Sequence, residues 1–316
     1  MPYVSGRPRL YYERTGTGEP MLWITGFTIS AAVFDPVLGD YAQDLECVTY
    51  DNRGSGRSGQ PMRFTSMPEL AGDAVRVLDA AGIASAHVYG LSMGGMIAQE
   101  MAIRFPDRVR GLVLGGTTPG GPRAVLPTLR ELTALALGAA GALRKPGRPW
   151  LGALVFSDAF RREEPERARE LLRHFAKHRA RPQGVAAHWW ASVYHDTVSR
   201  LKDIRAPTLV MHGDADAMTS TDNARMLAQQ IPDAELALVP GASHAYLLEA
   251  PEVSHALLAD WLARRSPIAP GTARRGWGAR AEPLTRALGL PVGAARTAHS
   301  LISMTTRARS RHVAPD

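Results

Sequence analysis

The sequence predicts an α/β fold: a mostly parallel sheet that carries helices on both faces. Three observations support it: strand-like runs that are apolar throughout, amphipathic helical segments that alternate with them, and one long helical interruption of this alternation. Runs without a polar face are typical of parallel strands, because crossover helices cover both sides of such a sheet. With 316 residues, 45% of them hydrophobic, the chain can form a large core with one inserted region.

The alternation of strand and helix patterns is clearest before residue 118. Strands are expected in RPRLYYERTG (7–16), PMLWITGF (20–27), LECVTY (45–50), AHVYG (86–90) and RGLVLGGT (110–117). Apolar residues at helical spacing predict helices in MPELAGDAVRVLDAAGI (67–83) and SMGGMIAQEMAIRFPDRV (92–109). Two further strands are expected in APTLVMHGDAD (206–216) and AELALVPGASH (234–244).

Residues 119–200 interrupt this alternation. They have helical patterns, many arginines and glutamates, and the aromatic cluster HWWASVYHD (188–196), but no convincing strand pattern. We expect a helical cap over the carboxyl ends of the strands, where open α/β sheets bind ligands. The core domain would then comprise residues 1–118 and 201–265.

Residues 266–316 differ in composition, being rich in Ala, Gly, Pro, Arg and Ser. Eight arginines, no lysine and two acids give this segment most of the net charge of +7. We expect a disordered tail without a role in turnover; contact with nucleic acid or an anionic membrane is the alternative. The overall richness in Arg, Ala, Gly and Pro is associated with a GC-rich bacterial source.

The cysteine content and the lengths of the apolar segments indicate the cellular compartment that is expected for the protein. The only cysteine is Cys47, so an intrachain disulfide is excluded, and a cytoplasmic setting is expected. Cys47 lies in an apolar run and is interpreted as a packing residue. The longest apolar stretch, residues 132–143, is too short to span a bilayer, which takes about 20 residues.

Ser92 lies between Gly90 and Gly94, where a predicted strand passes directly into a predicted helix. The pattern G-x-S-x-G in this context predicts a sharp, strained turn that presents the hydroxyl above the sheet edge. The start of the following helix favours negative charge beside it. Ser92 is therefore the candidate nucleophile, and the backbone N–H of Met93 is a candidate oxyanion donor. A second donor is expected from the loop after an early strand, with the N–H of Phe27 as the candidate.

A serine hydroxyl needs a base to take its proton, and the base needs an orienting acid. His244 follows the last predicted strand, while Asp214 and Asp216 both follow the strand before it. Among the other histidines, His87 and His212 lie in strand runs and are expected to form core hydrogen bonds. His174 and His178 have a spacing that suits two metal ligands, but no third ligand accompanies them, so neither a metal nor a cofactor is expected.

Five short motifs together resemble the α/β-hydrolase superfamily: TGF (25–27), DNRGSGRS (51–58), GLSMGG (90–95), HGDAD (212–216) and GASH (241–244). The chain looks most like the branch of serine esterases, enol-lactonases and cofactor-free haloperoxidases. The resemblance implies the triad Ser92, Asp216 and His244, because the family places its acid three residues after a glycine, here Gly213. Asp214 would then be a loop or capping acid.

The chain departs from its relatives at two points. Thr25-Gly26 stands where relatives usually have His-Gly, which leaves the backbone donor in place but changes the support of the loop. The motif at 51–58 also resembles proline iminopeptidases, but Met93 stands where those enzymes have a tryptophan, so a peptidase ranks lower. We interpret this motif as structural, with Arg53 and Arg57 fixing loops through ion pairs.

These residues predict a serine hydrolase that cleaves a carboxylic ester, lactone or thioester of a small, apolar molecule through an acyl-enzyme. The alternatives with the same triad are a perhydrolase or haloperoxidase and a C–C bond hydrolase; a noncatalytic binding protein ranks below them, since it has no need of a triad. The cap is expected to select the substrate. Its aromatic residues Trp189, Trp190, Tyr194 and Phe156 suit an apolar group, or alternatively pack the cap against the body.

Overall fold

The fold is known from a computed structural model that describes residues 2–61, 63–125, 149–175 and 180–265. The predicted tail at 266–316, His178 and part of the predicted cap lie outside the described residues. Within the described ranges, no helix is long and apolar enough to cross a membrane.

Eight strands form one sheet in the order β1-β2-β4-β3-β5-β6-β7-β8. β1 pairs with β2 and β2 with β4 in antiparallel fashion, whereas every pair from β4 to β8 is parallel. The strands are β1 (Tyr3–Val4), β2 (Leu10–Thr15), β3 (Glu19–Ile24), β4 (Leu45–Tyr50), β5 (Ala86–Leu91), β6 (Val109–Gly115), β7 (Thr208–Gly213) and β8 (Ala234–Val239). The predicted mostly parallel sheet is confirmed.

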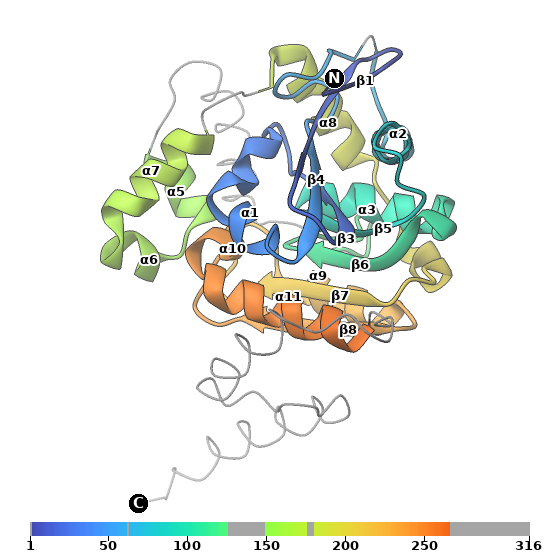
Figure 1. Ribbon diagram of the computed structural model, residues 1–316. Coiled ribbons are helices and arrows are strands. Elements are labelled where there is room, and N and C mark those ends of the chain that lie inside the picture. The colour runs from blue at the N-terminus through green and yellow to red at the C-terminus, as the bar shows by residue number, and fades with distance from the viewer. Residues whose placement is uncertain (1, 62, 126–148, 176–179, 266–316) are drawn as a thin grey trace, which may run out of the picture.

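Helices cover both faces of this sheet (Figure 1). Those between or after the strands are α1 (Asp35–Tyr41), α2 (Met67–Ala80), α3 (Met93–Arg104), α9 (Thr221–Gln230), α10 (Tyr246–Glu249) and α11 (Pro251–Arg265). Four more, α5 (Pro149–Val155), α6 (Asp158–Glu163), α7 (Pro165–Phe175) and α8 (Pro182–Val193), lie between β6 and β7. Short 3-10 turns occupy Ala31–Phe34, Pro106–Arg108 and Val198–Asp203.

Two apolar cores result from the alternation of side chains along each strand. In β3, Leu22 and Ile24 face the core beneath α2, α3 and α9, whereas Met21 and Trp23 face the core beneath α1, α10 and α11. All four side chains are fully buried, as expected for a strand covered on both sides. Cys47 lies in the second core as a buried free thiol, as its apolar neighbourhood predicts.

The helices between β6 and β7 attach to the body in two places. Side chains of α5, α6 and α7 join the core of α1 and α10, and Phe156 is buried there against Phe160 and Phe175. Helix α8 instead packs near the loops that follow β3 and β4 (Figure 1). The carboxyl ends of the parallel strands therefore lie beside residues from this inserted region.

Candidate active site

Ser92 occupies a strained turn between β5 and α3. Its φ is 56° and its ψ is −120°, a conformation that a residue with a side chain rarely adopts. The flanking glycines permit it, because a Cβ on Gly90 would lie 2.3 Å from the carbonyl oxygen of Gly94, and one on Gly94 would lie 2.1 Å from that of Ile24. The Ser92 N–H donates to the carbonyl of Gly115 at 2.7 Å, which ties the turn to β6.

Asp216 and His244 lie in contact beyond the ends of β7 and β8. Asp216 Oδ2 is 2.9 Å from His244 Nδ1, and Oδ1 accepts hydrogen bonds from the backbone N–H groups of Met218 and Thr219 at 2.8 and 2.9 Å. Burial acts to raise the pKa of the Asp216 carboxyl, but its contacts with His244 and His212 prevail and hold this pKa well below its usual range. Asp216 is therefore an anion, suited to orient an imidazole and stabilise its charge.

His212 is a second histidine against the same carboxylate. Its Nε2 is 3.1 Å from Asp216 Oδ2 and 2.8 Å from the carbonyl oxygen of Thr219. The prediction that His212 forms a core hydrogen bond is confirmed, but the contact with Asp216 was missed. The four-residue spacing around the end of β7 is the sequence signal that could have revealed it.

Asp214, the alternative acid, points elsewhere. Its Oδ1 accepts a hydrogen bond from the N–H of Gly241 at 2.7 Å, and the residue is exposed. It therefore links the loop after β7 to the turn after β8, which agrees with the expectation of a loop or capping acid.

The end of β6 brings the serine and the histidine into one region. Gly115 accepts the hydrogen bond from Ser92, and a Cβ on the next residue, Gly116, would lie 3.4 Å from Cε1 and Nδ1 of His244. Ser92 and His244 thus both lie against the Gly115–Gly116 segment. Residues more than 150 positions apart in the chain meet here because the carboxyl ends of parallel strands share one edge of the sheet.

The loop after β3 contacts the turn that holds Ser92. A Cβ on Gly26 would lie 3.2 Å from Ser92 Cβ, so the two segments approach closely. Thr25 supports this loop in place of the usual histidine: its hydroxyl donates to the carbonyl of Ile29, and it receives a hydrogen bond from the Asn52 amide, both at 3.2 Å. The candidate donors Phe27 N–H and Met93 N–H belong to these two touching segments.

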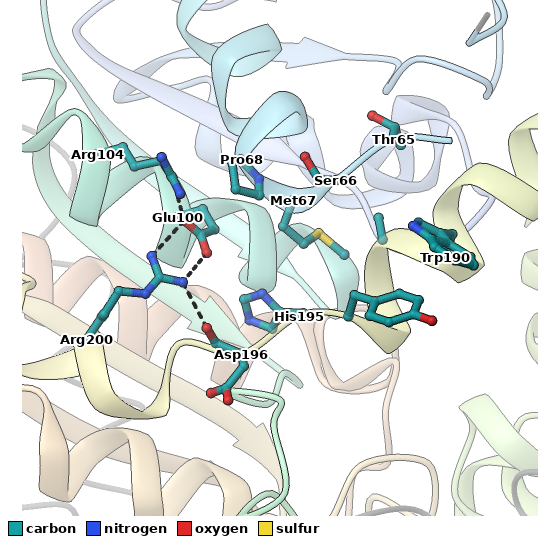
Figure 2. Close-up of a pocket in the computed structure, with 12 residues that line it drawn as sticks. Thr65, Ser66, Met67, Pro68, Glu100, Arg104, Trp190, His195, Asp196 and Arg200 are labelled. Carbon is teal, nitrogen blue, oxygen red and sulfur yellow. Dashed lines mark hydrogen bonds and ion pairs between the residues drawn. The ribbon is translucent and has the colours of Figure 1, made fainter. Parts of the chain in front are cut away.

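The aromatic residues at the end of α8 lie in two different surroundings: one borders the loop after β3, and the others line a pocket. Trp189 contacts Phe27 edge-on, with ring centroids 6.4 Å apart, and so borders the loop after β3. The rings of Trp190 and Tyr194 contact each other at a tilt of 41° and line a separate pocket of about 250 Å³, whose other lining residues include Met67, Glu100 and His195 (Figure 2). The described lining of this pocket contains no triad candidate, and Phe156 packs inside the core.

Both arginines of the motif at 51–58 form ion pairs. Arg53 forms a bidentate ion pair with Asp73 at 2.5 and 2.8 Å, and Arg57 pairs with Glu13 at 3.1 Å, so the predicted loop-fixing ion pairs are confirmed. The ring of His174 contacts the carbonyl of Ala32. Among the described residues, no three His, Cys, Asp or Glu side chains are grouped as a metal site.

A mostly parallel sheet with a strained serine turn, and with a paired aspartate and histidine beyond later strands, defines the class of α/β-hydrolases. A family model described as alpha/beta hydrolase fold matches residues 19–251. The chain therefore belongs to the α/β-hydrolase family and is a hydrolase, which confirms the predicted superfamily and fold class.

Individual relatives agree with this assignment. The chain is 33% identical over 261 residues to a protein of Azorhizobium caulinodans assigned as the carbamate hydrolase RutD, covering 82% of this chain and 97% of the relative. It is 30% identical over 247 residues to the pimeloyl-acyl-carrier-protein methyl ester esterase of Chromobacterium violaceum, covering 76% and 92%. The crystal structure of the enol-lactonase from Burkholderia xenovorans matches the fold with a TM-score of 0.71 and 23% identity, covering 83% and 100%.

Proposed function

We propose that this chain is a serine hydrolase that cleaves a carboxylic ester, lactone or thioester of a small, apolar molecule through an acyl-enzyme. The observation that carries the proposal is the 2.9 Å contact between Asp216 and His244, located beside the strained turn of Ser92. In this contact His244 Nδ1–H donates to the carboxylate, which leaves Nε2 as the acceptor for the serine proton.

The proposed reaction has two balanced halves. Ser92 Oγ attacks the carbonyl carbon while His244 accepts its proton, and the proton then passes to the leaving alkoxide or thiolate as the acyl–oxygen or acyl–sulfur bond breaks. Water repeats the sequence on the acyl-enzyme and releases the acid. The N–H groups of Phe27 and Met93 would bind the oxyanion of each tetrahedral intermediate, where a lost donor typically costs about 3 to 4 kcal/mol.

The relatives support a carbonyl substrate. One is assigned as a carbamate hydrolase and another is a methyl ester esterase, and both substrate classes offer a carbonyl carbon to a nucleophile. A carbamate is therefore the second candidate substrate, favoured by the 33% identity to the first of these proteins. Perhydrolysis and C–C bond cleavage would use the same triad. The lone, buried Cys47 supports a cytoplasmic location.

Labelling and turnover together test this function. A fluorophosphonate should label Ser92 alone, and a series of p-nitrophenyl esters of increasing acyl length should be hydrolysed with a maximum that defines the acyl pocket. Ser92→Ala should lower kcat by about 10⁶ without unfolding the protein. Labelling of a different serine, or turnover by Ser92→Ala close to that of the wild type, would contradict the assignment.

A further inference from the structure

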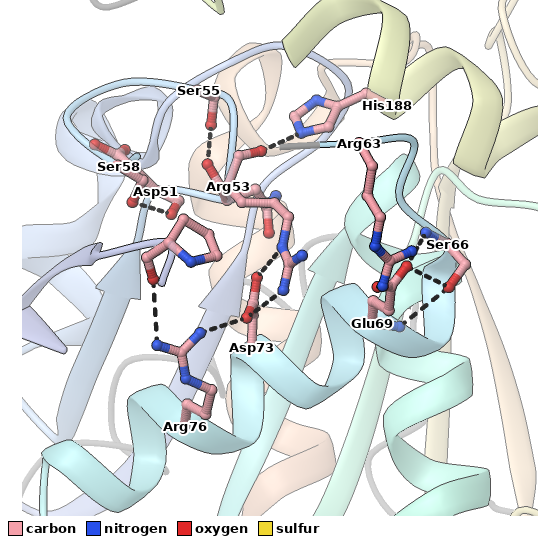
Figure 3. A network of polar contacts seen from close by, with 12 residues as sticks. Asp51, Arg53, Ser55, Ser58, Arg63, Ser66, Glu69, Asp73, Arg76 and His188 are labelled. Atoms are coloured by element: carbon pink, nitrogen blue, oxygen red, sulfur yellow. Dashed lines mark hydrogen bonds and ion pairs between the residues drawn. The ribbon is translucent and has the colours of Figure 1, made fainter. Parts of the chain in front are cut away.

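His188, on helix α8, joins two loops of the body to the inserted region. Its side chain is fully buried. The backbone N–H of Thr28 donates to His188 Nδ1 at 3.2 Å, and His188 Nε2 lies 2.7 Å from the carbonyl oxygen of Arg53. Figure 3 shows the second of these contacts beside the ion pairs of Arg53.

These two partners determine the tautomer of the ring. A backbone N–H can only donate and a carbonyl oxygen can only accept, so Nδ1 carries the lone pair and Nε2 carries the hydrogen. Burial lowers the pKa of His188 to about 4, and the hydrogen bond to Arg53 opposes this shift only in part. The ring is therefore neutral at physiological pH, which keeps Nδ1 available as an acceptor.

Thr28 needs this support because its backbone is strained. Its φ is 62°, in the left-handed region that a β-branched residue rarely adopts. Both of its backbone polar groups bond to the inserted region: the N–H to His188, and the carbonyl to the N–H of Ala180 at 3.1 Å. Thr28 directly follows Phe27, whose N–H is the proposed oxyanion donor, and the ring of Phe27 also contacts that of His188.

The second hydrogen bond of His188 ends at Arg53, in the loop after β4, and ion pairs hold this loop in place. The Arg53 guanidinium pairs with Asp73, whose carboxylate is nearly fully buried and also accepts from Arg76 at 2.9 Å (Figure 3). The same loop touches the start of α8, since a Cβ on Gly54 would lie 2.7 Å from Gly184 Cα. His188 Nε2 is therefore anchored to backbone that has little freedom to move.

We propose that His188 is a positioning residue for the oxyanion hole, and this inference rests on the proposed serine hydrolase function. Anchored on the Arg53 carbonyl, its neutral imidazole holds the Thr28 N–H and thereby orients the peptide that precedes it. Gly26 fixes the other end of this short loop against Ser92. The orientation of the Phe27 N–H therefore depends on helix α8 of the inserted region as well as on the sheet.

Replacement of His188 by phenylalanine tests the proposal, because the ring shape is kept while both hydrogen bonds are lost. Loss of one oxyanion donor costs about 10²- to 10³-fold in kcat, and a displaced donor should cost about 10- to 100-fold. KM should stay within about two-fold, since the donor acts mainly on the transition state. His188→Gln, which retains an acceptor and a donor, should recover part of kcat.

His195→Phe is the matched control. His195 is also buried, and its ring nitrogens have no hydrogen-bond partner among the described residues. This substitution should leave kcat within about two-fold of the wild type. Unchanged kcat in His188→Phe, or an equal loss in His195→Phe, would overturn the proposal.

Two measurements are independent of ester turnover. Amide hydrogen exchange of a peptide that spans residues 25–29 should be faster in His188→Phe than in the wild type or His195→Phe. In the wild type, ¹⁵N spectra of the His188 ring should show a bare Nδ1 and a protonated Nε2, a test that needs no folded variant. Unchanged exchange in His188→Phe, or the opposite tautomer in the wild type, would refute the positioning role of His188. A wild type that cleaves no ester would refute the proposed function instead, and the exchange and tautomer measurements would still test whether His188 holds the loop.

Discussion

His212 and Asp216 lie side by side at the end of β7, with Nε2 of the histidine 3.1 Å from Oδ2 of the aspartate. This oxygen is also the one that His244 contacts, while the other carboxylate oxygen accepts two backbone N–H groups. Asp216 is therefore held on all sides by donors, which explains how a fully buried carboxylate stays ionised.

The first prediction concerns the choice between the two aspartates. Asp216→Asn should lower kcat by about 10³- to 10⁴-fold, because the amide cannot stabilise the imidazolium and permits the wrong tautomer. Asp214→Asn, which changes a group bonded only to the Gly241 N–H among the described residues, is the control and should stay within a few-fold. Steady-state kinetics of both variants on the same ester measure the two kcat values. A large loss in Asp214→Asn with a small loss in Asp216→Asn would show that Asp214 is the acid.

The second prediction concerns His212. His212→Phe removes one donor from the buried Asp216 carboxylate, and a hydrogen bond to a charged group is worth about 1.5 to 3 kcal/mol. We expect kcat to fall about ten-fold and the midpoint of urea denaturation to decrease. If both quantities match those of the wild type, His212 is only a packing residue.

The third prediction concerns Gly94 in the first turn of α3. A Cβ on Gly94 would lie 2.1 Å from the Ile24 carbonyl oxygen, so Gly94→Ala should lower the free energy of unfolding by about 1 to 3 kcal/mol. Gly72→Ala in α2 is the control, because a Cβ there meets no atom within 4 Å, and it should stabilise the helix by about 0.5 to 1 kcal/mol. Urea denaturation of both variants measures the contrast, and equal effects would show that α3 shifts freely.

The fourth prediction concerns the pH dependence of stability. Burial lowers the pKa values of His188 and His195 from 6.5 to about 4, so between these values the unfolded chain binds more protons than the folded one. The stabilisation that comes from keeping these two histidines neutral is fully present above pH 6.5. As the pH falls towards 4, the free energy of unfolding decreases by up to about 3 kcal/mol for each histidine.

Denaturation series between pH 7 and 4 measure this slope. His195→Phe should have a shallower slope than the wild type, because one of the two buried imidazoles is removed. A wild-type stability that does not change over this range would show that neither histidine stays neutral in the folded protein.

Local sequence was sufficient for the strands and for the turn at Ser92. Strands that are apolar throughout are typical of a sheet covered on both faces, and the pattern G-x-S-x-G between a strand and a helix is typical of a sharp turn that presents a serine. These patterns act between near neighbours, so the fold class and the candidate nucleophile could be predicted without the structure.

The tertiary structure decided which distant groups meet. Asp214 and Asp216 follow the same strand two residues apart, and only the path of the chain after β8 brings His244 to one and the Gly241 N–H to the other. The partners of His188 lie 160 and 135 residues away, so no local pattern marks it. Likewise, Trp189 borders the loop after β3 while its neighbour Trp190 lines a pocket elsewhere, because successive residues of a helix point about 100° apart and their surroundings depend on how α8 packs.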